Sequence, residues 1–359
     1  MTRFLQLHLL VPYAAANLNR DDTGRPKTLM FGGAERLRIS SQSLKRAFRT
    51  SDVFAAGLPG ALGTRSQSFM QRLIDALVAR GLEPADATAR AEAVIEHDHL
   101  GKVKDKGKGV AKTEQLVHLG PDELAAVEAL AERLAGSDAL GEKTMLVLRD
   151  KPRAADIAMF GRMLADNPGY KIDAAVQVAH AFTTHRATVE DDYYTAIDEI
   201  KNADQDADRG AGFIGVQEFG AGLFYLYICL DADLLLNNLS GERDLAADTV
   251  AALIRAATTV SPKGKQNAFA SRAKSRYALL EIGEDSPRSL AAAFQHAVGA
   301  AHKDTGDQFE DSVRRLVELR DGFARAYGEK LESTEMKVDD PASATLDTLI
   351  GAARAVFAA

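Results

Sequence analysis

Three observations predict an α+β fold for this chain of 359 residues. Apolar runs with the alternation of a β-strand occur in both halves of the chain, and segments with helical periodicity follow them. A long, mainly helical stretch separates the first strand and helix from the others. The composition, 46% hydrophobic and 26% charged residues, is typical of a globular protein that buries a sizeable core.

The first strand is predicted over residues 4–11, where leucines and a valine alternate with Gln6 and His8. A loop rich in Asn, Asp, Gly and Pro is expected over 12–33. Ser40 or Ser41 can then cap the N-terminus of a helix that runs to about Thr50.

Residues 51–165 are predicted to form a helical insertion that extends from the main sheet. Helical periodicity marks four candidate helices, near 66–80, 84–96, 121–135 and 153–165. Between the second and the third lies a stretch rich in lysine and glycine, 101–112, which we expect to be a mobile loop.

The second half of the chain completes the sheet. A strand is predicted within 170–183, and a stronger one over 223–230 follows an acidic excursion at about 186–212. A helix over 246–260 and a strand over 277–282 come next. Outer helices are predicted near 289–302, 307–327 and 341–358.

Without the excursions, the order is strand, helix, strand, strand, helix, strand. This is the ferredoxin-like or RRM-like plan, in which two helices cover one face of a sheet. RRM-type folds hold single-stranded RNA on the opposite face, so we expect that face to be free. The order alone does not establish a function, because this fold hosts many activities.

Charge is unevenly distributed along the chain. The net charge is −7, yet residues 1–50, 102–112 and 263–276 carry local balances of +6, +4 and +5, which leaves −22 for the rest. Phosphate binding depends on where cations converge, because salt screens exposed charges beyond about 10 Å. The pattern fits a basic groove on an acidic body; ordinary solvated faces are the alternative.

Composition also excludes some classes of protein. The longest apolar runs, such as 223–230, are too short for the roughly 20 residues of a membrane span, and the N-terminus has no signal-peptide pattern. Cys229 is the only cysteine, which excludes an internal disulfide and a zinc cluster held by thiolates. A cytoplasmic protein is the simple interpretation.

The best candidate for a binding surface is the helix predicted after Ser40. One face of it carries the positions i, i+3, i+4 and i+7, which are Gln42, Lys45, Arg46 and Arg49. Three cations with no intervening acid repel one another unless an anion lies against them. We call these four residues the cationic stripe and expect it to bind phosphate; a solvated helix face is the alternative.

Other polar motifs carry weaker signals. Arg20 could add a phosphate contact, whereas Asp21 and Asp22 beside it are more typical of a turn than of a metal site. The stretch 101–112 lacks the spacing of a phosphate loop, and either a basic loop on nucleic acid or a solvated loop remains possible. The two histidine clusters, His97 with His99 and His180 with His185, lack zinc-site spacing, and no nucleophile signature occurs, so no metal, cofactor or catalytic residue is expected.

A pair of aromatic residues follows two aspartates in the acidic excursion, in the order Asp191, Asp192, Tyr193, Tyr194, Thr195. Aromatic side chains at the end of such a segment could wedge between bases, because every base offers a stacking face. The alternative is that the tyrosines cover a small core.

Several motifs closely resemble CasC, the backbone subunit of type I-E Cascade, in the CRISPR Cas-seven superfamily. The matching segments are 19–22, 31–33, 38–47, 179–185 and 217–219. The run 38–47, Arg-Ile-Ser-Ser-Gln-Ser-Leu-Lys-Arg-Ala, is long and specific. The resemblance extends from the N-terminus to about residue 283 and is weakest in 51–150 and in the C-terminal helices.

The resemblance implies the shape of a right hand. The RRM-like palm would comprise 1–50, 166–185 and, with the C-terminal helices, 221–359; the helical fingers would be 51–165, and a thumb hairpin or loop 186–220. Several copies would assemble head-to-tail along a CRISPR RNA and, with other Cascade subunits, present it for recognition of target DNA in antiviral defence. The subunit itself would not be catalytic.

The resemblance also assigns residues by position. The guide phosphates would be bound by Arg20, Ser40, Gln42, Lys45, Arg46 and Arg49. Met163 would lie against the kinked guide backbone, and Lys265 would belong to a basic loop of the palm. The thumb wedge would be formed by Tyr193, Tyr194 and Thr195, where family members often have Trp-Phe-Thr.

The lysines of the stretch 101–112 have no positional match in the family. Contact with DNA through them is a hypothesis, and the residues concerned are Lys102, Lys104, Lys106, Lys108 and Lys112.

Two alternatives come from other functional classes. A metal-dependent ribonuclease is the first, because related backbone subunits of type III complexes cleave target RNA with a thumb aspartate, and Asp191 or Asp192 could take that role. The second is a generic single-strand RNA-binding module that works alone.

Overall fold

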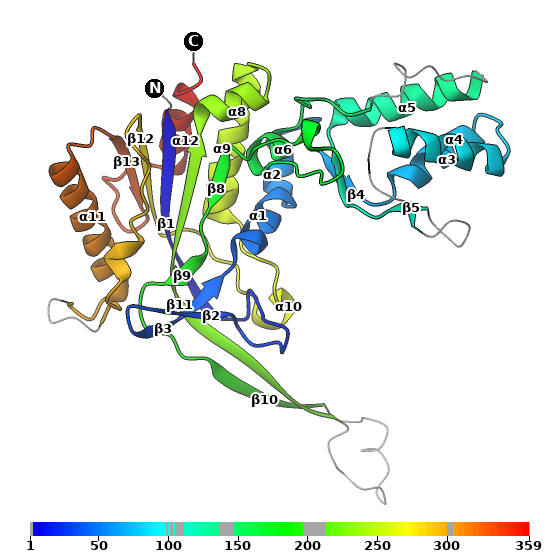
Figure 1. Cartoon of the computed structure of the whole chain (residues 1–359). Coiled ribbons are helices and arrows are strands. Elements are labelled where there is room, and N and C mark those ends of the chain that lie inside the picture. Colours follow the sequence, from blue (N-terminus) through cyan, green and yellow to red (C-terminus); the bar gives the residue numbers. More distant parts are fainter. Residues whose placement is uncertain are drawn as a thin grey trace, which may run out of the picture.

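The fold is built around the long strand β1 (Phe4–Ala16), which lies inside an antiparallel sheet (Figure 1). The computed structural model describes residues 3–97, 100, 103–104, 111–136, 147–196, 213–299 and 304–358. Strand β1 pairs on one side with β11 (Phe213–Asp231) and on the other with β12 (Tyr277–Gly283). Within the described residues, the sheet follows the order β13-β12-β1-β11-β9-β3-β2, with β8 and β10 also paired to β11.

The predicted α+β plan is confirmed. Strand β1 is followed by α1 (Ser41–Arg49), then by the short strands β8 (Val176–Val178) and β9 (Ala181–Thr183). Strand β11, helix α9 (Arg243–Thr259) and β12 complete the order strand, helix, strand, strand, helix, strand.

One face of β1 packs against helices, as its alternation predicts. Leu5, Leu7 and Leu9 are at most 4% exposed and share a core with α1, α9 and further helices. These further helices are α2 (Asp52–Ala56), α6 (Ala155–Phe160), α8 (Ala232–Asn238) and α12 (Leu346–Ala355).

The expectation that the other face of the sheet is free is wrong. Gln6, His8 and Leu10 point to that face, yet they are at most 1% exposed. Helix α11 (Gln308–Tyr327) and the short 3-10 helix η3 (Ala291–Phe294) cover it, and Figure 1 shows α11 on the opposite side of β1 from α9. Over β1, the sheet therefore leaves no open platform for RNA.

The polar residues under this cover satisfy one another. The His8 ring contacts the Tyr225 hydroxyl at 2.9 Å and the Glu281 carboxylate at 3.1 Å, and Arg288 donates to both oxygens of Glu281. Burial alone would raise the pKa of Glu281, but the hydrogen bonds from Arg288 and His8 bring it to about 2. The buried carboxylate thus stays ionised and paired.

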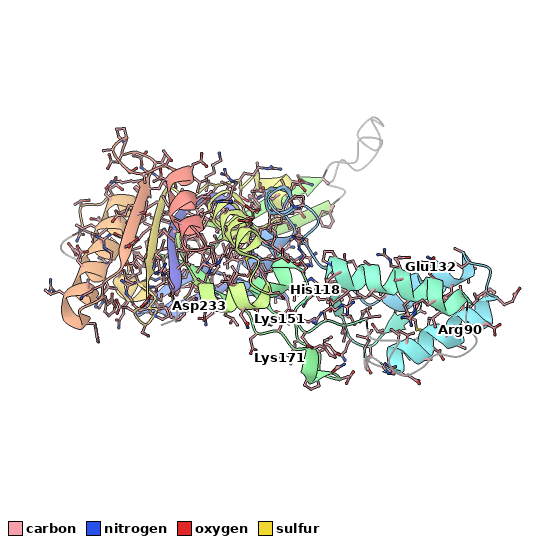
Figure 2. The ribbon with its side chains drawn as sticks, turned by 90° about the horizontal axis from the view of Figure 1, so that it is seen from above. Arg90, His118, Glu132, Lys151, Lys171 and Asp233 are labelled. Carbon is pink, nitrogen blue, oxygen red and sulfur yellow. The ribbon has the colours of Figure 1, made fainter. Side chains whose placement is uncertain are left out.

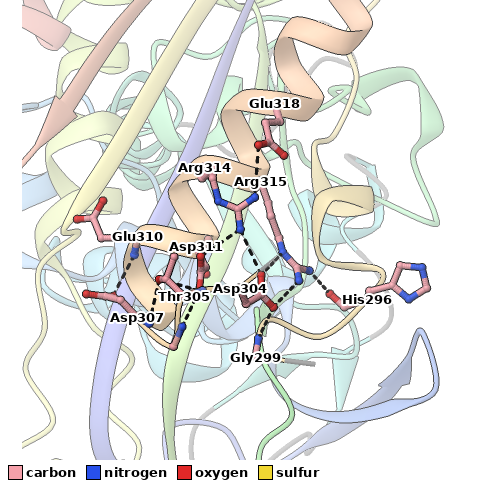
Figure 3. A network of polar contacts seen from close by, with 12 residues as sticks. His296, Gly299, Asp304, Thr305, Asp307, Glu310, Asp311, Arg314, Arg315 and Glu318 are labelled. Carbon is pink, nitrogen blue, oxygen red and sulfur yellow. Dashed lines mark hydrogen bonds and ion pairs between the residues drawn. The ribbon is translucent and has the colours of Figure 1, made fainter. Parts of the chain in front are cut away.

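The start of α11 is fixed by a second polar network (Figure 3). Asp304 accepts hydrogen bonds from the Gly299 backbone and from Arg315, and Asp311 accepts from the Thr305 backbone and from Arg314. These bonds join α11 to the chain on its N-terminal side and so fix where the helix begins.

The helical insertion has its own core. Helices α3 (Phe69–Val78), α4 (Pro84–His97) and α5 (Pro121–Gly136) pack around Leu73, Val94 and other buried residues. Figure 1 shows them projecting to one side of the sheet. Short strands lie among them, β4 (Thr64–Ser66) with β7 (Val117–Leu119) and β5 (Val103–Lys104) with β6 (Lys112–Thr113).

Several predicted boundaries are wrong. The helix expected at 153–165 ends at Phe160, because Gly161 follows with φ +80°. Instead of a helix over 289–302, the described part contains only η3. The sequence interpretation also missed β13 (Glu332–Lys337), α10 (Gln266–Phe269) and the 3-10 turn η2 (Pro168–Tyr170). In the described residues, no helix is long and apolar enough to cross a membrane.

The loop expected over 12–33 contains the first strand and the turn of a hairpin. Strand β1 continues to Ala16, and β2 (Thr28–Phe31) pairs with β3 (Ala34–Ile39). The connection is Gly32-Gly33 with φ +59° and +76°, the positive values that a two-residue type I′ hairpin requires. A Gly-Gly pair between apolar residues was therefore a hairpin signal in the sequence.

We predict that Gly32→Ala destabilises the protein much more than Gly33→Ala. Both changes place a side chain in the left-handed region, at a cost of roughly 1–2 kcal/mol. A Cβ on Gly32 would also lie 1.4 Å from the Gln295 carbonyl oxygen, whereas one on Gly33 meets nothing within 4 Å. We expect Gly32→Ala to lose about 2 kcal/mol more in urea unfolding. Equal losses would mean that the hairpin does not pack on η3.

Candidate nucleic-acid interface

Helix α1 forms as the sequence predicts. Ser40 is its N-cap, and its hydroxyl accepts a hydrogen bond from the Ser43 backbone at 3.4 Å. Leu44, Ala47 and Phe48 are buried on one side of the helix. On the other side, Gln42 and Arg46 are exposed, and Lys45 and Arg49 are half-buried. The geometry of the cationic stripe is confirmed.

Only some of the cations of the stripe lack a carboxylate partner in the part of the chain that the structure describes. Within the described residues, no carboxylate pairs with Lys45 or Arg46, and burial lowers the pKa of Lys45. Arg49, in contrast, donates to Asp156 of α6 at 3.2 Å. An acid distant in the sequence therefore lies against Arg49, whose assignment to phosphate stays a prediction. No local signal could have found this contact, since Asp156 is 107 residues away in the chain.

Asn19 joins the loop after β1 to the start of α1. Its side-chain oxygen accepts from the Ser40 backbone at 2.8 Å, and its carbonyl accepts from the Lys27 backbone at 2.8 Å. Arg20, next to it, is exposed. Ser40 itself is only 8% exposed, because it serves as the cap. Sequence reasoning did not single out Asn19 for this role.

The turn after Arg20 is of the kind predicted from its aspartates. One oxygen of Asp21 accepts hydrogen bonds from the Thr23 backbone, the Thr23 hydroxyl and the Arg25 backbone, with distances of 2.7–3.0 Å. These bonds lower the pKa of Asp21, and the bond from the Thr23 hydroxyl contributes most. The turn interpretation is confirmed for Asp21.

Lys265 reaches the same region from a distant part of the chain. Gly264 packs so closely on the end of β1 that a Cβ there would lie 2.3 Å from the Leu18 carbonyl oxygen. The next residue, Lys265, is exposed and has φ +51°. A cavity of about 770 Å³ beside it is also lined by Lys263 and Arg272. The loop of 263–272 and the loop after β1 thus form one basic region next to α1.

Met163 projects from the base of the helical insertion. Its side chain is 82% exposed, although the neighbouring Arg162 is only 3% exposed. Arg162 donates to both oxygens of Glu123 at 2.7 and 2.8 Å and to backbone carbonyls, including that of Tyr170 at 3.1 Å. Because this buried pair fixes the backbone at Arg162, Met163 has a defined position despite its exposure.

The predicted aromatic wedge lies on a two-stranded hairpin formed by β10 (Glu190–Ala196) and β11. Tyr193 is 63% exposed and Tyr194 45% exposed, so the alternative that they cover a small core is wrong. The two point to opposite faces, as neighbours in a strand do. The Tyr194 ring lies 6.1 Å from that of Phe213, while Tyr193 and Thr195 share the other face with Val216 and Ile214.

The groups weighed for metal or acid–base chemistry are dispersed or already bonded. Asp191 and Asp192 are exposed on the hairpin, and no group of three metal-ligating residues occurs in the part of the chain that is described. His180 accepts from Arg38 at 2.8 Å. His185 donates to the Arg186 carbonyl and accepts from the Leu223 backbone, which fixes a neutral ring.

The lysines proposed for DNA contact lie mostly beyond what can be described. Lys112 is exposed at the start of β6, and Lys104 pairs with it across β5. Lys102, Lys106 and Lys108 fall outside the described residues, as does most of the loop expected at 101–112.

Comparison with known proteins extends over almost the whole chain. In a structure titled "CRISPR RNA-guided surveillance complex, pre-nicking", one chain is 29% identical with a TM-score of 0.84, and the match covers 99% of this chain and 100% of that one. A second, titled "CRISPR RNA-guided surveillance complex", is 25% identical with a TM-score of 0.74, covering 98% and 99%. No curated protein matches. The family model described as "CT1975-like protein" matches residues 5–355, and the chain therefore belongs to the CT1975-like protein family.

Proposed function

We propose that this chain is an RNA-binding backbone subunit of a CRISPR RNA-guided surveillance complex. The observation that carries the proposal is the contact between the segments that bear four cations: the loop with Arg20 touches the start of α1, which bears Lys45 and Arg46, and it also touches the loop with Lys265. Similarity along the whole chain to chains of two solved surveillance complexes supports it.

Such a surface suits a nucleic-acid backbone better than individual bases. Lysine and arginine side chains neutralise phosphates whatever the base sequence, whereas base edges are read by hydrogen bonds of defined geometry. Lys45 is half-buried, which lowers its pKa. The protein would thus hold the guide RNA and leave sequence recognition of target DNA to base pairing.

The β10–β11 hairpin supports assembly into a chain of copies. Tyr193, Val216 and Ile214 expose one apolar face, each at least 57%, and Tyr194 and Phe213 expose part of the other. A hairpin with two exposed apolar faces needs partners on both sides. Bases of the guide and the surface of the next copy would supply them, in a head-to-tail arrangement.

The finer assignments rest on the motifs in the sequence. The match of residues 38–47 to CasC favours type I-E Cascade, with its other subunits as partners and the cytoplasm as location. We also propose that the subunit is not catalytic, and that Met163, Tyr193, Tyr194 and Thr195 contact the guide.

We expect Lys45→Glu to weaken binding to every single-stranded RNA and to reduce the salt dependence of binding. Each lost phosphate contact lowers the slope of log K against log salt by about 0.7 for a single strand. Fluorescence anisotropy over a salt series measures both quantities. Lys330→Glu makes the same charge change near β13, at the other edge of the sheet, and should have no effect. A loss confined to some RNA sequences would contradict backbone binding.

Mixed with a CRISPR RNA and viewed by electron microscopy, the protein should form regular curved filaments. Ile214→Asp places a charge beside Tyr193 and Thr195 on the hairpin, which projects away from α1 (Figure 1), and should abolish the filaments while the cations of α1 still bind RNA. Disordered complexes with one copy per RNA would favour a module that works alone.

The assembled complex should leave a matched RNA intact when magnesium is added. The exposed Asp191 and Asp192 are the residues that a ribonuclease mechanism would use. Gel analysis of labelled RNA would reveal cleavage. Products at regular intervals that disappear in Asp192→Ala would overturn the non-catalytic proposal.

A further inference from the structure

The last turn of α1 meets the helical insertion at a single buried carboxylate. Asp156 is 1% exposed, and one of its oxygens accepts from the Gly63 backbone at 2.8 Å. The other accepts from Arg49 at 3.2 Å and from the His118 ring at 3.0 Å. Burial alone would raise the pKa of Asp156, but His118, Gly63 and Arg49 hold it below its usual range. The group is therefore an anion shared by α1 and the insertion.

A second arginine lies at the same junction. Arg65 is in β4, directly opposite His118 in β7, and residues opposite each other in an antiparallel pair share a face. The His118 ring contacts Asp156. The Arg65 side chain therefore projects from the same face of the β4–β7 pair as this contact. Figure 2 places His118 where the insertion joins the rest of the chain.

The electrostatics agree with this placement. Partial burial lowers the pKa of Arg65 although the residue is largely exposed, the positive charge of Arg49 lowers it further, and the negative charge of Asp156 raises it. Arg65 thus lies within the influence of both charged groups of the junction, although no hydrogen bond or ion pair to its side chain occurs among the described residues.

One carboxylate cannot neutralise two guanidinium groups. Arg49 holds the direct ion pair with Asp156 and is only 19% exposed, whereas Arg65 is exposed to solvent. Moving Arg49 to a phosphate would leave the buried Asp156 without its arginine partner, which is costly. Moving Arg65 breaks no contact within the described structure. The uncompensated positive charge at this end of the stripe therefore belongs to Arg65.

We propose that Arg65, from the helical insertion, binds a phosphate of the RNA and so extends the phosphate-binding surface beyond the cationic stripe. Arg49 instead remains with Asp156 and ties α1 to the insertion. The bound strand then runs from the loops at Arg20 and Lys265, over Lys45 and Arg46, to the insertion. This inference rests on the proposed RNA binding and adds a contact from a second part of the fold.

Four neutral variants test it with a short oligouridylate as the probe. We expect Arg65→Gln to weaken binding several-fold at low salt and to reduce the salt slope by about 0.7, as Lys45→Gln does. Arg49→Gln should leave the slope unchanged. Arg72→Gln removes an exposed cation elsewhere in the insertion, where it pairs with Glu128, and should also leave the slope unchanged.

Asp156→Asn is the complementary variant. It keeps the shape of the side chain but removes the charge that holds Arg49, so Arg49 becomes available and the salt slope should rise by about 0.7. This increase keeps the test valid if Arg49→Gln folds poorly, which circular dichroism would reveal.

The outcomes separate the two proposals. If Lys45→Gln reduces the slope and Arg65→Gln does not, RNA binding by the stripe stands and the role of Arg65 is refuted. A reduced slope in Arg49→Gln, or an unchanged one in Asp156→Asn, would refute the assignment of Arg49 to Asp156. If Lys45→Gln also has no effect, the proposed function itself fails.

Discussion

Burial of β1 on both faces is the constraint on which the rest of the structure depends. Its odd-numbered leucines pack against α1 and α9, and its even-numbered residues lie under α11. A strand covered in this way cannot present a flat surface to a ligand. Binding groups must therefore lie where β1 and its neighbours end, and the loop after β1, the start of α1 and the loop of 263–272 meet there.

These segments are joined through backbone groups rather than through the cations themselves. Asn19 accepts from the Ser40 backbone, and Gly264 rests on the Leu18 carbonyl. The backbone segments that carry Arg20, Lys45 and Lys265 are thus held in place, while the charged side chains remain exposed or half-buried. Such an arrangement orders the stems of the cations before RNA arrives, which reduces the entropy lost on binding.

Where charges are buried, they serve structure. Arg162 with Glu123 and Arg49 with Asp156 join segments distant in sequence, and Arg288 with Glu281 joins β12 to the segment that follows it. Removing one partner from such a pair leaves an uncompensated charge, so these contacts define the fold more than they add stability. The distinction between buried, paired arginines and exposed, unpaired ones separates structural from RNA-binding candidates.

The sequence by itself determined the features that depend on local periodicity and capping. The alternation in 4–11 identified β1, and the Ser40 cap with the 3.6-residue period identified α1 and its stripe. Periodicity shows which residues share a face but not what covers it. Only the tertiary structure decided that α11 covers the even face of β1, that Asp156 pairs with Arg49, and that Tyr193 and Tyr194 are exposed. Each of these depends on contacts between segments far apart in the chain, for which a single sequence carries no local signal.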